Sequence, residues 1–176
     1  MTPIAATQAW LEKAVIGLNL CPFAKAVHSK GQIHWVLSGA TTPADLLAEL
    51  VRELQHLSSA SPQAVDTTLI VHPLVLQDFA DFNDFLGLAD HTLVDEGLQG
   101  VLQIASFHPQ YQFADAAADD IGNATNRSPY PTLHLLREDS IERAVAAFPD
   151  AEAIYGRNIE TLQRLGHEGW ERLLGR

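Results

Sequence analysis

Between Thr42 and Leu57 the sequence repeats apolar residues at the three- and four-residue spacing of an α-helix. All of these residues then lie on one side, so the run predicts a helix that packs against another layer of structure. Thr42 is a suitable N-terminal cap, Pro43 fits the first turn, and Asp45 lies where the helix dipole favours an acid. The apolar side consists of Leu46, Leu47, Leu50, Val51, Leu54 and Leu57.

Short strand patterns alternate with helical patterns along the rest of the chain. We expect strands at residues 32–38, 67–73, 100–107 and 131–137. We expect further helices up to about residue 19, at 78–94, at 139–148 and at 151–175. Asp139-Ser-Ile-Glu142 resembles a capping box at the start of one of them. This order predicts an α+β fold, an α/β sandwich in which helices pack on a mixed, partly parallel sheet of about four strands.

Composition restricts the class of protein. A chain of 176 residues with 47 % apolar and 19 % charged residues suits a single globular domain over residues 1–176. The net charge of −11 would repel phosphate backbones, so we expect no nucleic-acid partner. No apolar run approaches the ~18 residues that span a bilayer, and the N-terminus lacks the pattern of a signal peptide. We therefore expect a cytoplasmic protein without a membrane partner.

One segment lacks convincing periodicity. Residues 108–131, HPQYQFADAAADDIGNATNRSPYP, join two apolar strands. Long loops inside compact domains are uncommon and are usually functional or disordered. The aromatic residues and prolines of this loop favour an ordered, functional segment.

Cys21 is the only cysteine, so an intrachain disulfide is excluded. Proline is favoured in the first turn of a helix, and Cys21-Pro22 therefore predicts that Cys21 caps the helix that follows. A thiol at this position would be stabilised as a thiolate by free backbone N–H groups and by Lys25 and His28. The alternative is a small buried apolar residue, which is the commoner fate of a free cysteine.

Two histidines lie on the strands that flank the long loop. His108 ends one strand and His134 lies inside the next, so neighbouring strands would bring both imidazoles toward the same face of the sheet. Either ring would serve as a general base, or as a hydrogen-bonded member of the core.

His72 also closes a strand, directly before Pro73. Because open α/β sheets often build sites at strand ends, His72, His108 and His134 form an alternative metal- or haem-binding set, although no metal-ligand spacing supports it. The remaining histidines, His34, His56, His91 and His167, are interpreted as surface or helix-face residues. No specific cofactor follows from the sequence.

The second half of the loop is rich in hydrogen-bond donors. Arg127 offers a rigid fork for a carboxylate or phosphate, and prolines fix the backbone around Tyr130. We interpret Asn126, Arg127, Ser128 and Tyr130 as the binding residues for an anionic small molecule. The alternative is an internally hydrogen-bonded loop in which Arg127 pairs with Asp119 or Asp120.

Four stretches carry a family resemblance: LNLCPFAKAVH, DFNDFL, QIASFHPQYQF and NATNRSPYPTLHLLRE. Together they resemble the DUF1415 family, whose members are bacterial and plant proteins of about this size. The resemblance runs from Trp10 to about Val145 and implies a stand-alone domain. It assigns no reaction, cofactor or catalytic residue.

The preferred functional hypothesis is a small enzyme, a cysteine-dependent hydrolase or transferase or a thiol redox enzyme. Cys21 would be the nucleophile or redox thiol, His108 or His134 the base, and Arg127 the residue that orients an anionic substrate. A non-catalytic carrier of a metal, haem or metabolite that uses His72, His108 and His134 is the alternative. A regulatory or scaffold domain is a third possibility.

Overall fold

A four-stranded mixed sheet forms the centre of the fold. The structure is a computed structural model that describes residues 1–148 and 150–175. The strands are β1 (Ile33–Leu37), β2 (Thr67–Val71), β3 (Leu102–Phe107) and β4 (Thr132–Arg137), in the order β1-β2-β4-β3. β1 and β2 are parallel, whereas β4 is antiparallel to both of its neighbours. The expected α+β class and mixed sheet are confirmed.

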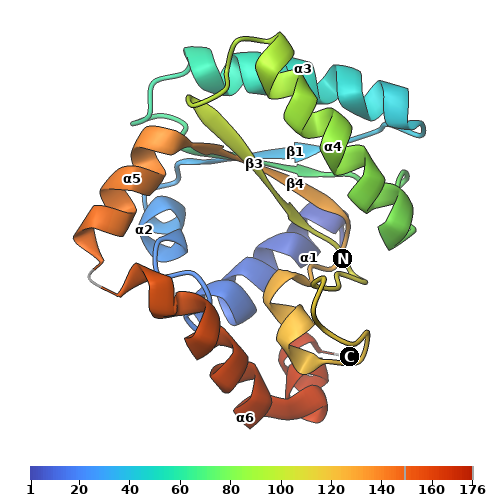
Figure 1. Ribbon diagram of the computed structural model, residues 1–176, viewed down its shortest axis with the longest axis vertical. Coiled ribbons are helices and arrows are strands. Elements are labelled where there is room, and N and C mark those ends of the chain that lie inside the picture. The colour runs from blue at the N-terminus through green and yellow to red at the C-terminus, as the bar shows by residue number, and fades with distance from the viewer. Residues whose placement is uncertain (149, 176) are drawn as a thin grey trace.

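Helices cover both faces of this sheet (Figure 1). In that view α3 and α4 lie above the sheet, and α1, α2 and α6 lie below it. The α-helices are α1 (Pro3–Trp10), α2 (Ala24–Ser29), α3 (Pro43–Ser59), α4 (Phe79–Asp95), α5 (Glu138–Ala147) and α6 (Ile154–Leu174). Shorter helical segments are η1 (Leu11–Ile16), η2 (Ile121–Asn126) and η3 (Ala151–Ala153).

The face under α3 and α4 carries the better-sealed core. Leu46, Leu50, Leu54 and Leu57 of α3 are all completely buried. Thr42 caps α3 through its side chain, and Pro43 lies in the first turn, as expected. These leucines pack against inward side chains of the sheet and of α4, chiefly Ile70, Phe82, Phe85, Leu133 and Leu135.

The opposite face is covered less completely. Its buried cluster consists of Trp10, Leu11, Ala14, Val15, Leu20, Ala124, Leu162 and Trp170. The sheet residues packed against it, among them Ile33, Trp35 and Phe107, keep part of their surface exposed. α5 contributes no buried residue.

Two local expectations are wrong. The segment up to residue 19 is not one regular helix, because α1 begins at Pro3 with Thr2 as its cap and passes into the π-helical η1. The capping box at Asp139-Ser-Ile-Glu142 is absent: α5 begins one residue earlier, after Arg137. Ser140 donates instead to Asp66 at 2.6 Å, so its hydroxyl joins α5 to the loop before β2.

β1, β2 and β3 all point in the same direction, because β4 runs antiparallel to β2 and to β3. Their carboxyl ends therefore lie at one edge of the sheet. The chain leaves this edge through Ser38, His72 and His108, each of which is buried.

Candidate histidine site on the sheet

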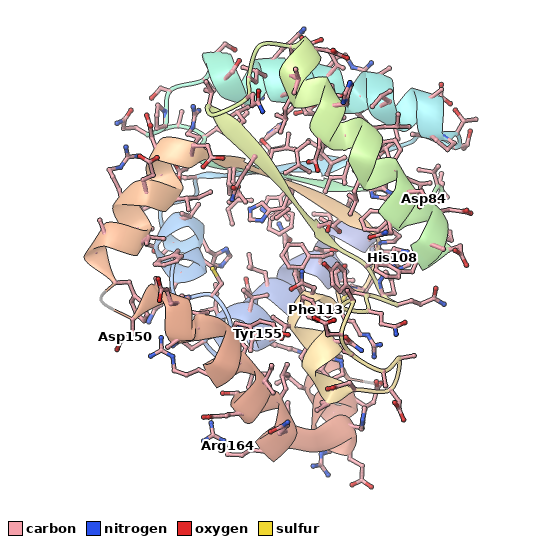
Figure 2. All side chains as sticks on the ribbon, in the orientation of Figure 1. Asp84, His108, Phe113, Asp150, Tyr155 and Arg164 are labelled. Atoms are coloured by element: carbon pink, nitrogen blue, oxygen red, sulfur yellow. The ribbon has the colours of Figure 1, made fainter. Side chains whose placement is uncertain are left out.

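His108 lies on the α3–α4 face of the sheet. Its ring contacts Phe79 and Phe82 at centroid distances of 5.4 and 5.0 Å, and Figure 2 shows it beside the start of α4. Nδ1 accepts a hydrogen bond from the Gln110 backbone N–H at 3.0 Å, so Nε2 carries the proton and donates to the Leu76 carbonyl at 3.1 Å. Burial lowers the pKa of His108. Both of its nitrogens are occupied by the protein itself.

His72 lies on the same face, stacked on Phe82 at 5.7 Å. Its Nδ1–H donates to the Val75 carbonyl at 3.1 Å. Nε2 is buried and has no hydrogen-bond partner among the described residues. Burial lowers the pKa of His72 to about 4, so the ring is neutral near pH 7. His72 and His108 thus hold the loop of residues 72–78 through two successive backbone carbonyls.

His134 lies on the opposite face. β4 pairs with β3 so that His134 is opposite Ala105, and its ring is 5.9 Å from that of Phe107. The expectation that His108 and His134 approach the same face is therefore wrong. The strands are neighbours, but the antiparallel register places His108 with Leu133 and His134 with Phe107. Consequently the three histidines His72, His108 and His134 do not converge on one ion.

A single hydrogen bond fixes the protonation pattern of His134. Thr67 Oγ1 donates to the Leu135 carbonyl at 2.6 Å, so it must accept from His134 Nε2, which lies 2.7 Å away. Nδ1 then carries the lone pair. Nδ1 has no hydrogen-bond partner within the described ranges, and it is not one of the side-chain atoms that lack solvent-accessible surface. Burial lowers the pKa of His134 to about 4, which keeps the ring neutral.

The three imidazoles therefore differ in what they offer a ligand. His108 uses both nitrogens, and His72 keeps a free but sealed nitrogen. Of the three, only His134 combines a neutral ring, a fixed tautomer and an acceptor atom that keeps some solvent-accessible surface. A neutral imidazole of this kind is a general base or a hydrogen-bond acceptor.

Aromatic side chains frame His134. Phe107 contacts both His134 and Trp10, the latter edge-on at 5.1 Å. Trp10 Nε1 is buried and unpaired within the described part of the chain. We use the term His134 face for the partly exposed side chains of Trp35, Ala105, Phe107, His134 and Leu136.

Cys21 packs against the buried cluster that contains Trp10 and Leu20. It is partly buried and touches the residues around Trp10 and Leu20 rather than the α3–α4 core. It does not cap a helix, because the N-cap of α2 is Phe23. Cys21 lies before α2, and its backbone carbonyl accepts a hydrogen bond from Ala24 N–H at 3.3 Å. No hydrogen bond involves its sulfur among the described residues. The expected cap position is wrong, because α2 starts later than Cys21-Pro22 implied.

The local backbone explains this position of Cys21. η1 ends at Ile16 and is followed by Gly17, where a Cβ atom would lie 2.2 Å from the Lys13 carbonyl oxygen, so only glycine fits there. Asn19 then adopts a left-handed conformation with φ 54°, which asparagine tolerates better than most residues. Leu20 and Cys21 N–H groups both point to the Val15 carbonyl, at 2.9 and 3.5 Å. The chain therefore turns back on η1 before α2 begins.

The long loop is held together by the residues that the sequence assigned to an anion. Arg127 donates to the carbonyls of Tyr111 and Ala118, at 3.0 and 2.7 Å. Asn126 donates to Ser106 at 3.2 Å, and Ser128 donates to Tyr130 at 2.6 Å. The predicted partners Asp119 and Asp120 are not used by Arg127. Phe113 of the loop also packs edge-on against Tyr155 of α6, as Figure 2 shows.

Asn123 and Thr67 are buried residues that make hydrogen bonds around the candidate site, which the sequence interpretation does not identify. Asn123 is completely buried, accepts from Phe113 N–H at 3.0 Å and donates to Ala117 at 2.8 Å. Thr67 appeared only as a strand residue. The density of Asn and Asp in the loop was the available signal for Asn123, whereas the pairing of Thr67 with His134 depends on strand register.

Two surface pockets flank the segment that contains Cys21. The larger, about 290 Å³, is lined by basic Lys30 and Arg143 together with Gln32, Asp66 and Ser140. The smaller, about 120 Å³, is lined by Asn19, Pro22, Arg157, Asn158 and Thr161 among others. Arg127 lines neither of these two pockets, whose basic side chains are Lys30, Arg143 and Arg157.

Comparison with known proteins identifies the family. The chain belongs to the family described as "Protein of unknown function (DUF1415)", whose model matches residues 2–172. No match was found among curated proteins or among solved structures. Within the described residues, no helix is both long and apolar enough to cross a membrane.

Proposed function

We propose that the protein binds a small organic molecule against the His134 face and that His134 Nδ1 acts on it as a hydrogen-bond acceptor or general base. The observation that carries this proposal is the tautomer of His134. Its Nε2–H donates to Thr67, so the lone pair of the neutral ring lies on Nδ1, which keeps some solvent-accessible surface. A general base needs such an accessible lone pair in its resting state.

The side chains around His134 indicate the chemical class of the ligand. Trp35 and Phe107 are partly exposed apolar rings, which favour an aromatic or apolar group. His134 Nδ1 requires a donor, such as a hydroxyl or an N–H group. The ligand therefore combines a flat apolar part with one polar hydrogen.

We propose Lys30 and Arg143 as the basic partners of an anionic group on a ligand that extends beyond the His134 face. Both line the larger pocket, and Lys30 directly follows α2. Arg127 is a poorer candidate because two of its donors already bond to loop carbonyls. This version of the proposal keeps the expected anionic substrate but moves the residues that recognise it.

Cys21 adds a catalytic version of the proposal. Its thiol is partly exposed and packs on the same apolar cluster as Trp35 and Phe107. We propose that it attacks the acyl carbonyl carbon of an ester ligand that also contacts His134: the C–S bond forms as the C–O bond of the ester breaks, and the leaving alkoxide takes the thiol proton and departs as an alcohol. In this version the thiol and the imidazole act through the ligand rather than through a direct contact. Without the Cys21 step, the same site describes a non-catalytic metabolite carrier.

Two matched probes test the binding site. 4-Hydroxybenzoate and 4-hydroxybenzamide each present a phenolic donor and an aromatic ring, and they differ in charge. We expect either probe to shift the side-chain ¹⁵N resonance of His134 and the ring protons of Phe107 in NMR spectra. A larger effect from the benzoate would support an anionic ligand, and equal effects would support a neutral one.

Variants identify the atom that binds. His134→Gln keeps a donor for Thr67 but replaces the basic Nδ1 with an amide oxygen, which accepts hydrogen bonds but is not a base at neutral pH and is held in a different geometry. We therefore expect the probe-induced shifts of the Phe107 ring protons to become much smaller. His91→Gln changes an exposed histidine on α4 and serves as the control. Unchanged binding in His134→Gln would contradict the proposal.

The role of Cys21 has a separate readout. We expect a saturating probe to slow alkylation of Cys21 by iodoacetamide in the wild type but not in His134→Gln. Equal alkylation rates with and without bound probe would remove Cys21 from the site, while leaving the binding proposal intact.

A further inference from the structure

Three metal-ligating side chains meet at the edge of the sheet, away from the His134 face. His34 comes from β1, while Glu53 and His56 come from α3, one helical turn apart. One ligand atom of each residue lies within 4.8 Å of the other two. From the sequence alone, His34 and His56 are interpreted as surface or helix-face residues.

Glu53 lies between the two imidazoles. Its Oε2 is 3.3 Å from His34 Nε2 and 3.9 Å from His56 Nδ1. This oxygen has no accessible surface, and neither imidazole contact has the geometry of a hydrogen bond. A buried carboxylate oxygen without a hydrogen bond is costly, and a bound cation would satisfy it together with the two imidazole nitrogens.

The spacing fits a small transition-metal ion. Zinc binds imidazole nitrogen and carboxylate oxygen at about 2.0–2.2 Å, which separates the atoms of a tetrahedral set by about 3.3 Å. The His34–Glu53 pair already has a separation of 3.3 Å. His56 is the ligand that must move closer, and its side chain is 49 % exposed.

We propose that His34, Glu53 and His56 bind a divalent transition-metal ion of the zinc class, with a fourth coordination position open to solvent. Two imidazoles and one carboxylate suit this class, whereas Ca²⁺ and Mg²⁺ require oxygen ligands. Three protein ligands with an open fourth position are the arrangement of reactive zinc sites rather than of purely structural ones.

The site joins two elements of the fold. β1 is an edge strand and α3 packs over it, so an ion held by both would tie the strand to the helix. Metal binding to the folded state raises its stability by mass action. This inference is independent of His134, because that residue lies on the other face of the sheet.

Zinc itself is the probe for this site. Protein without a histidine tag is treated with a chelator, dialysed, and titrated with Zn²⁺ in a calorimeter. We expect one ion per chain and a higher thermal unfolding midpoint. Co²⁺ should give visible absorption bands that report the imidazole and carboxylate ligands.

Matched variants locate the ion. Glu53→Gln keeps the shape of the side chain but removes the negative charge, and His56→Ala removes an exposed ligand. We expect each to weaken zinc binding about tenfold or more, and the exposed-histidine control His91→Ala to leave it unchanged. Circular dichroism of each variant checks that its fold is intact.

One measurement needs no variant. Zn²⁺ should shift the side-chain ¹⁵N resonances of His34 and His56 in the wild-type protein and leave that of His91 in place. Absence of zinc binding to the wild type, or affinity that is equal in all variants, would overturn the inference. Shifts confined to other histidines would overturn it as well.

Discussion

His134 Nε2 lies 2.7 Å from Thr67 Oγ1, and this contact decides which nitrogen of the imidazole is available. Thr67 cannot donate to His134, because its proton goes to the Leu135 carbonyl. The pair therefore places the lone pair of His134 on Nδ1. The pairing of the neighbouring strands β2 and β4 thus fixes the tautomer of the His134 ring before any ligand binds.

Thr67→Val tests this relationship. Valine has nearly the same shape but leaves His134 Nε2–H unpaired, so we expect a loss of about 1–3 kcal/mol in the free energy of unfolding. The Nδ1–H tautomer should also appear in ¹⁵N NMR spectra. Thr68→Val is the matched control, because the hydroxyl of Thr68 is buried and unpaired among the described residues. That control should be neutral or stabilising; equal losses in both variants would contradict the assignment.

The sequence predicted what depends on local periodicity. The strands, α3 and α4 each follow from apolar spacing within their own segments, and all are present close to the expected bounds. The face on which each histidine lies depends on how β3 and β4 pair. Ala105 is opposite His134, and nothing in either strand alone specifies that register. The side assignment of His108 and His134 was therefore beyond local reasoning.

The sequence also could not predict which groups the polar side chains of Arg127, Glu53 and His56 contact. Arg127 bonds to backbone carbonyls, which every residue carries, so no pattern of side chains marks them. Glu53 and His56 have a spacing that is visible on α3, but their third member comes from β1. Only the packing of α3 over the edge strand brings His34 to them.

Asn158→Ala tests how α6 holds the segment before Cys21. Asn158 is buried and donates to the Leu20 carbonyl at 2.8 Å. Losing this bond should lower the free energy of unfolding by about 1–3 kcal/mol in urea titrations. It should also speed alkylation of Cys21, which follows Leu20. Asn83→Ala, at an exposed position of α4, should change neither quantity appreciably.

Arg127→Ala separates loop stability from ligand binding. Because Arg127 ties Tyr111 and Ala118 together, we expect faster proteolysis and hydrogen exchange within residues 111–118. Arg164→Ala, on α6, is the control. A loop that stays protected while binding of 4-hydroxybenzoate is lost would instead restore Arg127 as the residue that recognises the anion.

Acidification should destabilise the fold through two histidines on opposite faces. Burial lowers the pKa of both His72 and His134 to about 4, below their ordinary value of 6.5. The unfolded chain therefore takes up protons first as the pH falls, and stability present above pH 6.5 is lost progressively toward pH 4. Between pH 7 and pH 5 we expect each residue to reduce the free energy of unfolding by roughly 2 kcal/mol.

Isosteric variants isolate each contribution to this pH dependence. His72→Asn keeps a donor near the Val75 carbonyl, and His134→Gln keeps one for Thr67, but neither side chain titrates. We expect urea unfolding at pH 7 and pH 5 to show a smaller pH dependence in each variant than in the wild type, and the smallest in the double variant. The double variant should keep the contribution of His108, whose pKa burial also lowers. If it kept the wild-type slope, other groups would be responsible and the two rings would not be held neutral by burial.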